Sequence, residues 1–228
     1  MKKRIALNPL WWYYVSVFLR SVDFVGALFT PFLITWGHLS QDTVQFLQTW
    51  FWVWVVVLDF PTGILADRIP RKYSIAGGLF FAAFGFALYG TAPKLSVFLA
   101  GEFFIALGLA MISGVQGAWL AGTLRDLGRS NEAYAGIVAG RAVSLSSIAR
   151  MCTGIVGTLI AAQWGLNAPI ICAAIPNLCA ACIMFLLPEP TRQERRRAPI
   201  LETARIGITF VWRNKALRLL ALNMALVD

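Results

Sequence analysis

Residues 61–72 read Pro-Thr-Gly-Ile-Leu-Ala-Asp-Arg-Ile-Pro-Arg-Lys, a polar and basic turn between two long apolar runs. The run before it covers residues 46–60, and the run after it covers residues 73–90. A turn between two such runs belongs at a membrane surface, and its cations Arg68, Arg71 and Lys72 favour the cytoplasmic surface. The stretch is therefore either a topological anchor or a functional joint between two membrane helices.

Composition assigns the chain to the membrane. Hydrophobic residues make up 58% of the sequence and charged residues only 14%, whereas a soluble domain has about 25% charged residues. The net charge of +9 does not indicate a nucleic-acid partner, because the cations fall in short blocks between apolar runs and not on one soluble face. We therefore predict an all-α polytopic membrane protein whose surroundings are membrane lipids.

The apolar runs predict six transmembrane helices that form one bundle over residues 1–188. The six predicted spans are residues 10–35, 44–66, 73–91, 95–120, 135–162 and 168–187. Lys94 is the one Lys or Arg in the first, third and fifth connections, while the other connections are basic. The positive-inside rule then places both termini in the cytoplasm and predicts a multi-pass protein of the plasma (inner) membrane.

After the sixth span, residues 189–215 read as a basic cytoplasmic linker that contains an amphipathic helix. Residues 216–228 are apolar again but too short to cross a membrane, which takes about 20 residues. We expect them to be the start of a truncated seventh helix.

The residue order of the opening stretch adds a family signal. Gly63-Ile-Leu65-Ala66-Asp67-Arg68-Ile-Pro70-Arg71-Lys72 resembles the signature loop between helices two and three of the major facilitator superfamily, with Pro70 where that family usually has Gly. The Leu187-Pro188-Glu189-Pro190 exit of the sixth span is also similar to family members, mostly drug or metabolite permeases. The chain thus resembles the N-terminal six-helix half of such a transporter.

This resemblance implies secondary active transport by alternating access, with proton-coupled efflux of a drug-like or metabolite substrate as the expected reaction. It also implies that the loop helps to latch two halves together, through Gly63, Asp67, Arg68, Arg71 and Lys72. Gly63 permits close approach of another helix, and the cations hold the turn at the anionic inner leaflet. The latch needs a second six-helix half, which this chain lacks, or a homodimer partner.

Charged residues inside the predicted spans are candidates for the substrate and proton pathway, because an intramembrane ion is costly unless it is paired or hydrated. They are Arg20, Asp23, Asp59, Glu102, Arg141 and Arg150. Helix rise places Arg20, Asp23 and Arg150 near mid-membrane. It places Asp59 level with Arg141 in the inner third of the membrane, and Glu102 nearer the outer face. Arg20 and Asp23 are spaced to touch on one helical face. The alternative is a set of static ion pairs that fix helix packing.

The sequence gives little indication that the protein is an enzyme. The single histidine, His38, lies in an outer connection, and no phosphate-binding loop, nucleophile elbow or metal-ligand cluster occurs. The four cysteines lie in apolar runs and are expected to be packing residues. We predict no cofactor, no metal and no enzyme activity. Two other functions stay open: a six-helix membrane subunit of another complex, and a non-transporting fragment.

Small residues predict where helices approach closely. The third span contains Gly77, Gly78, Gly85 and Gly90, and the fifth contains the pairs Gly136 with Gly140 and Gly154 with Gly157. Small-residue pairs of this kind let two helix backbones come near each other in a membrane. We expect both spans to pack tightly against neighbours.

Overall fold

The computed structural model describes residues 8–191, and every regular element among them is helical. These residues belong to a single compact unit that ends at Thr191. Most of the predicted linker and the whole of the predicted seventh helix lie outside the described residues. The domain boundaries predicted there stay predictions.

Five helices in the described range are long and apolar enough to cross a membrane, if the last two elements are counted together. They are α3 (Gln41–Arg68), α4 (Arg71–Tyr89), α5 (Leu95–Asp126), α6 (Glu132–Trp164), and α7 (Ala168–Cys172) with α8 (Ala174–Leu186). They match the second to sixth predicted spans. Pro176 explains the break between α7 and α8, because proline has no N–H to donate to the carbonyl of Cys172.

The first predicted span is not one continuous helix. It consists of α1 (Pro9–Arg20), an irregular stretch over residues 21–25, a 3-10 turn η1 (Gly26–Leu28), the single turn α2 (Phe29–Pro31) and a π-type turn η2 (Phe32–Trp36). Only 12 residues of α1 are regular, which is too few to span a bilayer. Hydrophobicity located this segment, but its pattern carries no signal for the break.

The long helices begin where polar side chains accept hydrogen bonds from their first backbone N–H groups. The Ser40 side chain accepts from the backbone N of Thr43 at 3.3 Å, and Asn131 accepts from that of Ala133 at 3.0 Å. Such caps satisfy donors that have no partner inside the helix. In α3 the interior Pro61 is followed by Thr62, whose hydroxyl lies 2.7 Å from the Leu58 carbonyl and bonds back to it.

Glycines let α4 and α5 approach closely. A Cβ added at Gly78 would lie 2.7 Å from the Gly108 carbonyl oxygen, and one at Gly85 would lie 2.7 Å from that of Gly101. No real Cβ tolerates such contacts, so the predicted packing role of these third-span glycines is confirmed. Three fifth-span glycines do not pack against any helix of the described bundle, since no described atom lies within 4 Å of a Cβ built at Gly136, Gly140 or Gly154.

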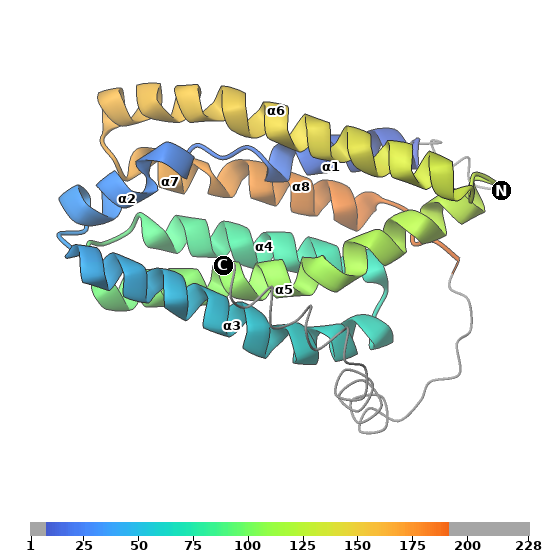
Figure 1. Ribbon diagram of the computed structural model, residues 1–228, viewed down its shortest axis with the longest axis horizontal. Coiled ribbons are helices and arrows are strands. Elements are labelled where there is room, and N and C mark those ends of the chain that lie inside the picture. Colours follow the sequence, from blue (N-terminus) through green and yellow to red (C-terminus); the bar gives the residue numbers. More distant parts are fainter. Residues whose placement is uncertain (1–7, 192–228) are drawn as a thin grey trace, which may run out of the picture. The chain divides into compact units, whose positions relative to one another are not determined.

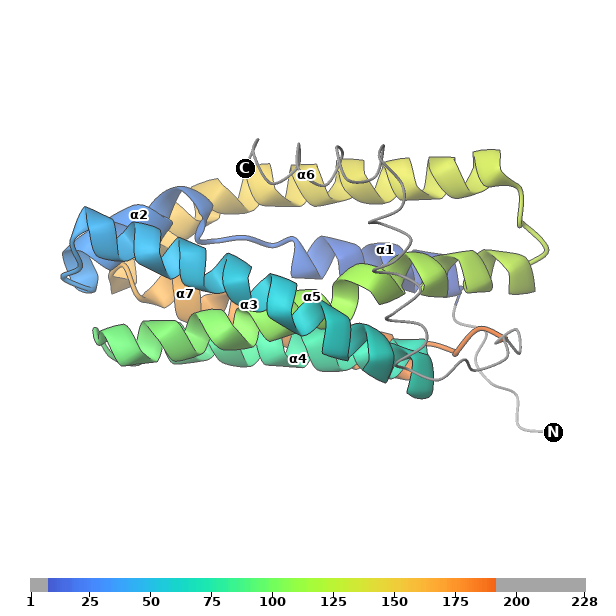
Figure 2. The same ribbon diagram turned by 60° about the horizontal axis from the view of Figure 1, so that its bottom comes forward.

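The helices pack in layers, with α4 and α5 together between α3 on one side and α1 and α8 on the other (Figure 1). The long α6 covers α1 and lies apart from α3 (Figure 2). Large apolar side chains are exposed on the outer faces of the two outermost helices, for example Val56 and Phe60 of α3 and Ile155 and Leu159 of α6. Such faces suit lipid or another helix of a membrane assembly and not water.

The cysteines do not behave as the sequence suggests. Cys152, Cys179 and Cys182 are exposed, Cys172 is half-buried, and none forms a disulfide with another. The three exposed cysteines therefore do not pack inside the described bundle, contrary to the predicted packing role. An apolar run predicts membrane depth, but not whether a side chain faces the bundle or the lipid.

Candidate functional site

The break in the first span is held by Asp23. One oxygen of its carboxylate, Oδ1, accepts hydrogen bonds from the backbone N of Val25 and of Gly26, both at 2.9 Å. Aspartate competes in this way with the regular i−4 bonding of a helix, which is why it favours turns and caps. The side chain thereby ends the irregular stretch and starts the next helical turn.

Helix α6 supports the break from the other side. The hydroxyl oxygen of Thr153 accepts from the backbone N of Asp23 at 3.0 Å, and the Thr153 hydroxyl itself donates to the Ala149 carbonyl at 2.7 Å. One turn further on, Gly157 lies directly against the Phe24 carbonyl, where a Cβ would collide. The non-helical backbone is thus partly satisfied by a neighbouring helix, the condition under which such backbone is tolerated at membrane depth.

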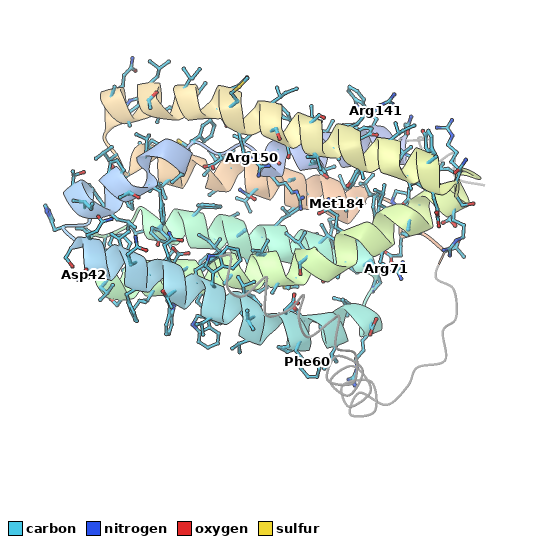
Figure 3. The ribbon with its side chains drawn as sticks, in the orientation of Figure 1. Asp42, Phe60, Arg71, Arg141, Arg150 and Met184 are labelled. Atoms are coloured by element: carbon cyan, nitrogen blue, oxygen red, sulfur yellow. The ribbon has the colours of Figure 1, made fainter. Side chains whose placement is uncertain are left out.

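A cavity of about 380 Å³ opens at this break. Arg20 and Asp23 line it from the first span, Arg150 from α6, Asn177 from α8, and Phe29 and Phe86 from α2 and α4. Figure 3 places Arg150 near the middle of the bundle and Arg141 nearer the end that carries Arg71. Three of the six residues predicted for the pathway therefore lie around one cavity.

The predicted pairing of these charges is wrong in two respects. Arg20 and Asp23 do not share a helical face, because the helix ends at Arg20 and the Asp23 carboxylate turns to the backbone of Val25 and Gly26. Asp59 and Arg141 are not partners either, since α3 and α6 lie on opposite sides of the bundle (Figure 1). The Asp59 carboxylate instead accepts from the Ser113 hydroxyl of α5 at 2.8 Å. Equal depth in the membrane does not place two residues on adjacent helices.

Glu102 is buried away from that cavity, close to the outer end of the bundle predicted from the loop charges. Its side chain is 4% exposed, and its Oε1 accepts a hydrogen bond from the hydroxyl of Tyr89 at 2.7 Å. Tyr89 is 1% exposed and belongs to an aromatic cluster with Phe32 and Phe98. The pair joins α4 to α5 in an apolar surrounding, where an unpaired charge is costly.

The basic loop between α3 and α4 is tied to two other helices. The guanidinium of Arg71 donates to the Ala118 carbonyl of α5 at 2.8 Å. The ammonium of Lys72 donates to the carbonyls of Phe185 and Leu187 at 3.2 and 3.0 Å, at the end of α8. Two of the predicted latch residues therefore bind carbonyls inside this bundle.

Glu189 is a site residue that the sequence reasoning missed. Its carboxylate accepts from the backbone N of Arg71 at 2.8 Å and from that of Lys72 at 3.0 Å, so that it caps the start of α4. It takes the place of a side-chain cap on α4, whose N-cap residue is Pro70. Pro70 has φ −56°, a value that proline adopts without strain. The sequence signal for this residue was the Leu187-Pro188-Glu189-Pro190 stretch, which indicated a similarity to family members but not a capping role.

The other predicted latch residues are exposed. Arg68 is exposed at the end of α3, and no described atom lies within 4 Å of a Cβ built at Gly63. Asp67 is exposed as well and has an interaction partner. The predicted close approach at Gly63 does not come from any helix of the described bundle.

A helical membrane bundle with a discontinuous first span, and with a cavity at the break that charged residues help to line, is an arrangement found in secondary transporters. Comparison with known proteins gives the family. The sequence profile of the Major Facilitator Superfamily matches residues 13–227, and this chain belongs to that superfamily. The L-fucose-proton symporter of Escherichia coli strain K12 is 32% identical over 77 residues, which cover 32% of this chain and 18% of that relative.

Membership of this superfamily identifies a multi-pass membrane protein of a transporter family and not of an enzyme family. The resemblance read from the loop between α3 and α4 is thereby confirmed. The matched segment of the relative is short, so what the relative transports is a statement about that protein alone.

Proposed function

We propose that this chain supplies one half of the translocation pathway of a proton-coupled secondary transporter that works by alternating access. The observation that carries the proposal is the cavity at the broken first span, lined by two charged residues of that span and by one of α6. Transporters commonly bind substrate near mid-membrane where helices are discontinuous, because the freed backbone and the buried charges can meet a ligand there.

A second surface is needed to close the pathway. Gly63 faces no described neighbour, and large apolar side chains are exposed along α3 and α6. A second six-helix half, or a second copy of the chain, would cover such faces and complete the latch at residues 63–72. We propose that both termini are cytoplasmic, so that this latch acts on the inner side of the membrane.

Glu102 is our candidate for the coupling proton. It is a carboxyl group buried beside a neutral tyrosine hydroxyl, with no cation among the described residues paired to it. When no counter-charge is near, a carboxyl group in such a place has a lower free energy as the neutral acid than as the carboxylate. Release and uptake of that proton would then accompany the change of state.

The test is transport in proteoliposomes made with the native protein, under an imposed pH gradient. We expect accumulation of a substrate that stops when a proton uncoupler is added. The Glu102→Gln variant should retain gradient-independent exchange but lose gradient-driven accumulation by at least about tenfold. The exposed Glu132, in the first turn of α6, provides the matched control as Glu132→Gln.

Full gradient-driven accumulation by Glu102→Gln would remove Glu102 from the coupling step. Absence of transport for every probe, with protein that is folded and inserted, would contradict the transporter proposal itself. A lipophilic fluorescent amine, L-fucose and the organic acids D-galacturonate, lactate and glycerol 3-phosphate are the first probes. The amine tests our expected drug-like efflux, and the sugar tests proton-driven uptake, a second candidate that the relative's name suggests.

A further inference from the structure

We infer that the cavity at the broken first span binds a small organic anion, with Arg20 and Arg150 holding its acidic group. This inference rests on the proposed transport function and names the substrate class of the same site. The acidic group is an oxyanion, either a carboxylate or a phosphate.

The charges around the cavity favour an anion. Arg20 and Arg150 contribute two guanidinium groups from two different helices, while Asp23 contributes one carboxylate. One oxygen of that carboxylate already accepts two backbone N–H groups. The cavity is therefore lined by an excess of positive charge, and its one acid is engaged in holding the backbone.

Both guanidinium groups keep most of their hydrogen-bonding capacity. Arg150 donates to the Ser146 hydroxyl at 3.0 Å, which uses one of its five N–H donors. Within residues 8–191, the guanidinium of Arg20 forms no hydrogen bond or ion pair with another residue, although Arg20 is half-buried. Arginine presents a planar fork of donors that suits carboxylate and phosphate oxygens. An oxyanion bound between the two guanidinium groups would offset the free-energy cost of placing two positive charges at membrane depth.

The rest of the lining sets the size and character of the ligand. A volume of about 380 Å³ admits a molecule of metabolite size. Phe29 and Phe86 offer apolar faces. The amide nitrogen of Asn177 donates to the Ala173 carbonyl at 2.9 Å, and the other hydrogen-bonding groups of that side chain can contact a ligand. A cationic or purely apolar ligand would leave the two arginines without a counter-charge. A neutral sugar would hydrogen-bond to them but would not balance their charge.

Binding to the purified native protein tests this inference separately from transport. The ligands are pairs that differ in an acidic group: D-galacturonate with D-galactose, lactate with 1,2-propanediol, and glycerol 3-phosphate with glycerol. Affinity is measured from ligand-dependent thermal stabilisation. We expect at least one acid to bind about tenfold or more tightly than its neutral counterpart. The first two pairs report a carboxylate site and the third a phosphate site.

Variants then locate the site. Arg20→Gln and Arg150→Gln should each weaken binding of that acid by about tenfold or more, as expected for loss of a charged hydrogen-bond partner. Arg20→Lys and Arg150→Lys, which keep the charge, should lose less affinity for that acid than the two Gln variants do. Arg129→Gln removes the same charge from an exposed residue whose guanidinium bonds to Tyr134, and should bind like the unaltered protein.

Several outcomes would overturn the inference. Equal binding of acid and neutral partner would do so, as would unchanged acid binding in folded Arg20→Gln and Arg150→Gln proteins. If neutral compounds are transported while no acid binds, the transporter proposal stands and the anion assignment fails. If nothing binds and nothing is transported, both fail.

Discussion

At the residue scale, the hydrogen bonding of Asp23 and its charge can be tested separately, because the amide variant keeps the first and removes the second. Asp23→Asn keeps an acceptor oxygen for the N–H groups of Val25 and Gly26, whereas Asp23→Ala removes it. We expect Asp23→Ala to lower the free energy of unfolding by about 0.5–2 kcal/mol, the usual value of a lost cap, and Asp23→Asn to lower it less. Thermal unfolding in detergent measures the difference.

Transport by the same two variants decides whether the charge of Asp23 matters beyond the fold. If Asp23→Asn is as stable as the unaltered protein and retains full proton-driven transport, then Asp23 carries neither a proton nor an essential charge, and its role is to hold the break. Loss of transport in a stable Asp23→Asn protein would place its charge in the pathway.

The sequence found Arg20, Asp23 and Arg150 because an ion inside an apolar run stands out whatever the structure is. It could not find their geometry. The expected i,i+3 contact between Arg20 and Asp23 assumed a continuous helix, and the carboxylate that was to pair with the arginine instead competes for backbone N–H groups. Spacing arguments hold only within one regular element.

At the scale of the element, the contact between α6 and the broken first span should depend on Gly157 and not on Gly154. A Cβ at Gly157 meets the Phe24 carbonyl, while one at Gly154 meets no described atom within 4 Å. We expect Gly157→Ala to destabilise the protein by about 1–3 kcal/mol, as overpacking does. Gly154→Ala should be neutral or stabilising by up to about 1 kcal/mol through helix propensity.

Both glycine variants are to be compared by thermal unfolding and by binding at the cavity. A Gly157→Ala protein as stable as Gly154→Ala would contradict the close contact between α6 and residue 24. From the sequence the two glycines are equivalent, since each belongs to the same small-residue pair. In the structure they differ in the direction that each faces, because Gly157 faces Phe24 and Gly154 faces no described atom within 4 Å.

The start of α4 should depend on Glu189, three residues beyond the end of α8. Glu189→Ala leaves the N–H groups of Arg71 and Lys72 without their acceptor, and we expect a loss of about 0.5–2 kcal/mol in the free energy of unfolding. Asp42→Ala is the control, because Asp42 also lies in the first turn of a helix but is exposed. An equal loss in both variants would contradict the capping role.

At the scale of the whole molecule, loop charge predicts which connections face which side. We expect an impermeant maleimide to label a His38→Cys variant in intact cells, and to label Arg129→Cys only after the membrane is opened. The measurement needs a background in which Cys152, Cys172, Cys179 and Cys182 are replaced, because three of these are exposed. Labelling of both variants from the same side would contradict the predicted topology.

The long apolar runs predicted the helical class and the positions of α3 to α8 well, because a segment that crosses the lipid must be long and apolar and must satisfy its backbone hydrogen bonds within itself. They could not predict which helices are neighbours. Asp59 and Arg141 were matched by depth, yet contacts between helices depend on side-chain shape and on glycines such as Gly78 and Gly85, which bring α4 against α5.

The reciprocal ties between α4 and α8 have a mechanical consequence. Glu189 holds the first N–H groups of α4, while Lys72 holds the last carbonyls of α8, and Arg71 fastens the same turn to α5. Sliding α4 past α8 would break several charge-assisted bonds at once, and sliding α5 past α4 would break the bond from Arg71 to the Ala118 carbonyl. The three helices should therefore travel as one rigid body during the proposed transport cycle, which leaves residues 21–25 as the hinge about which the remaining part of the first span can turn.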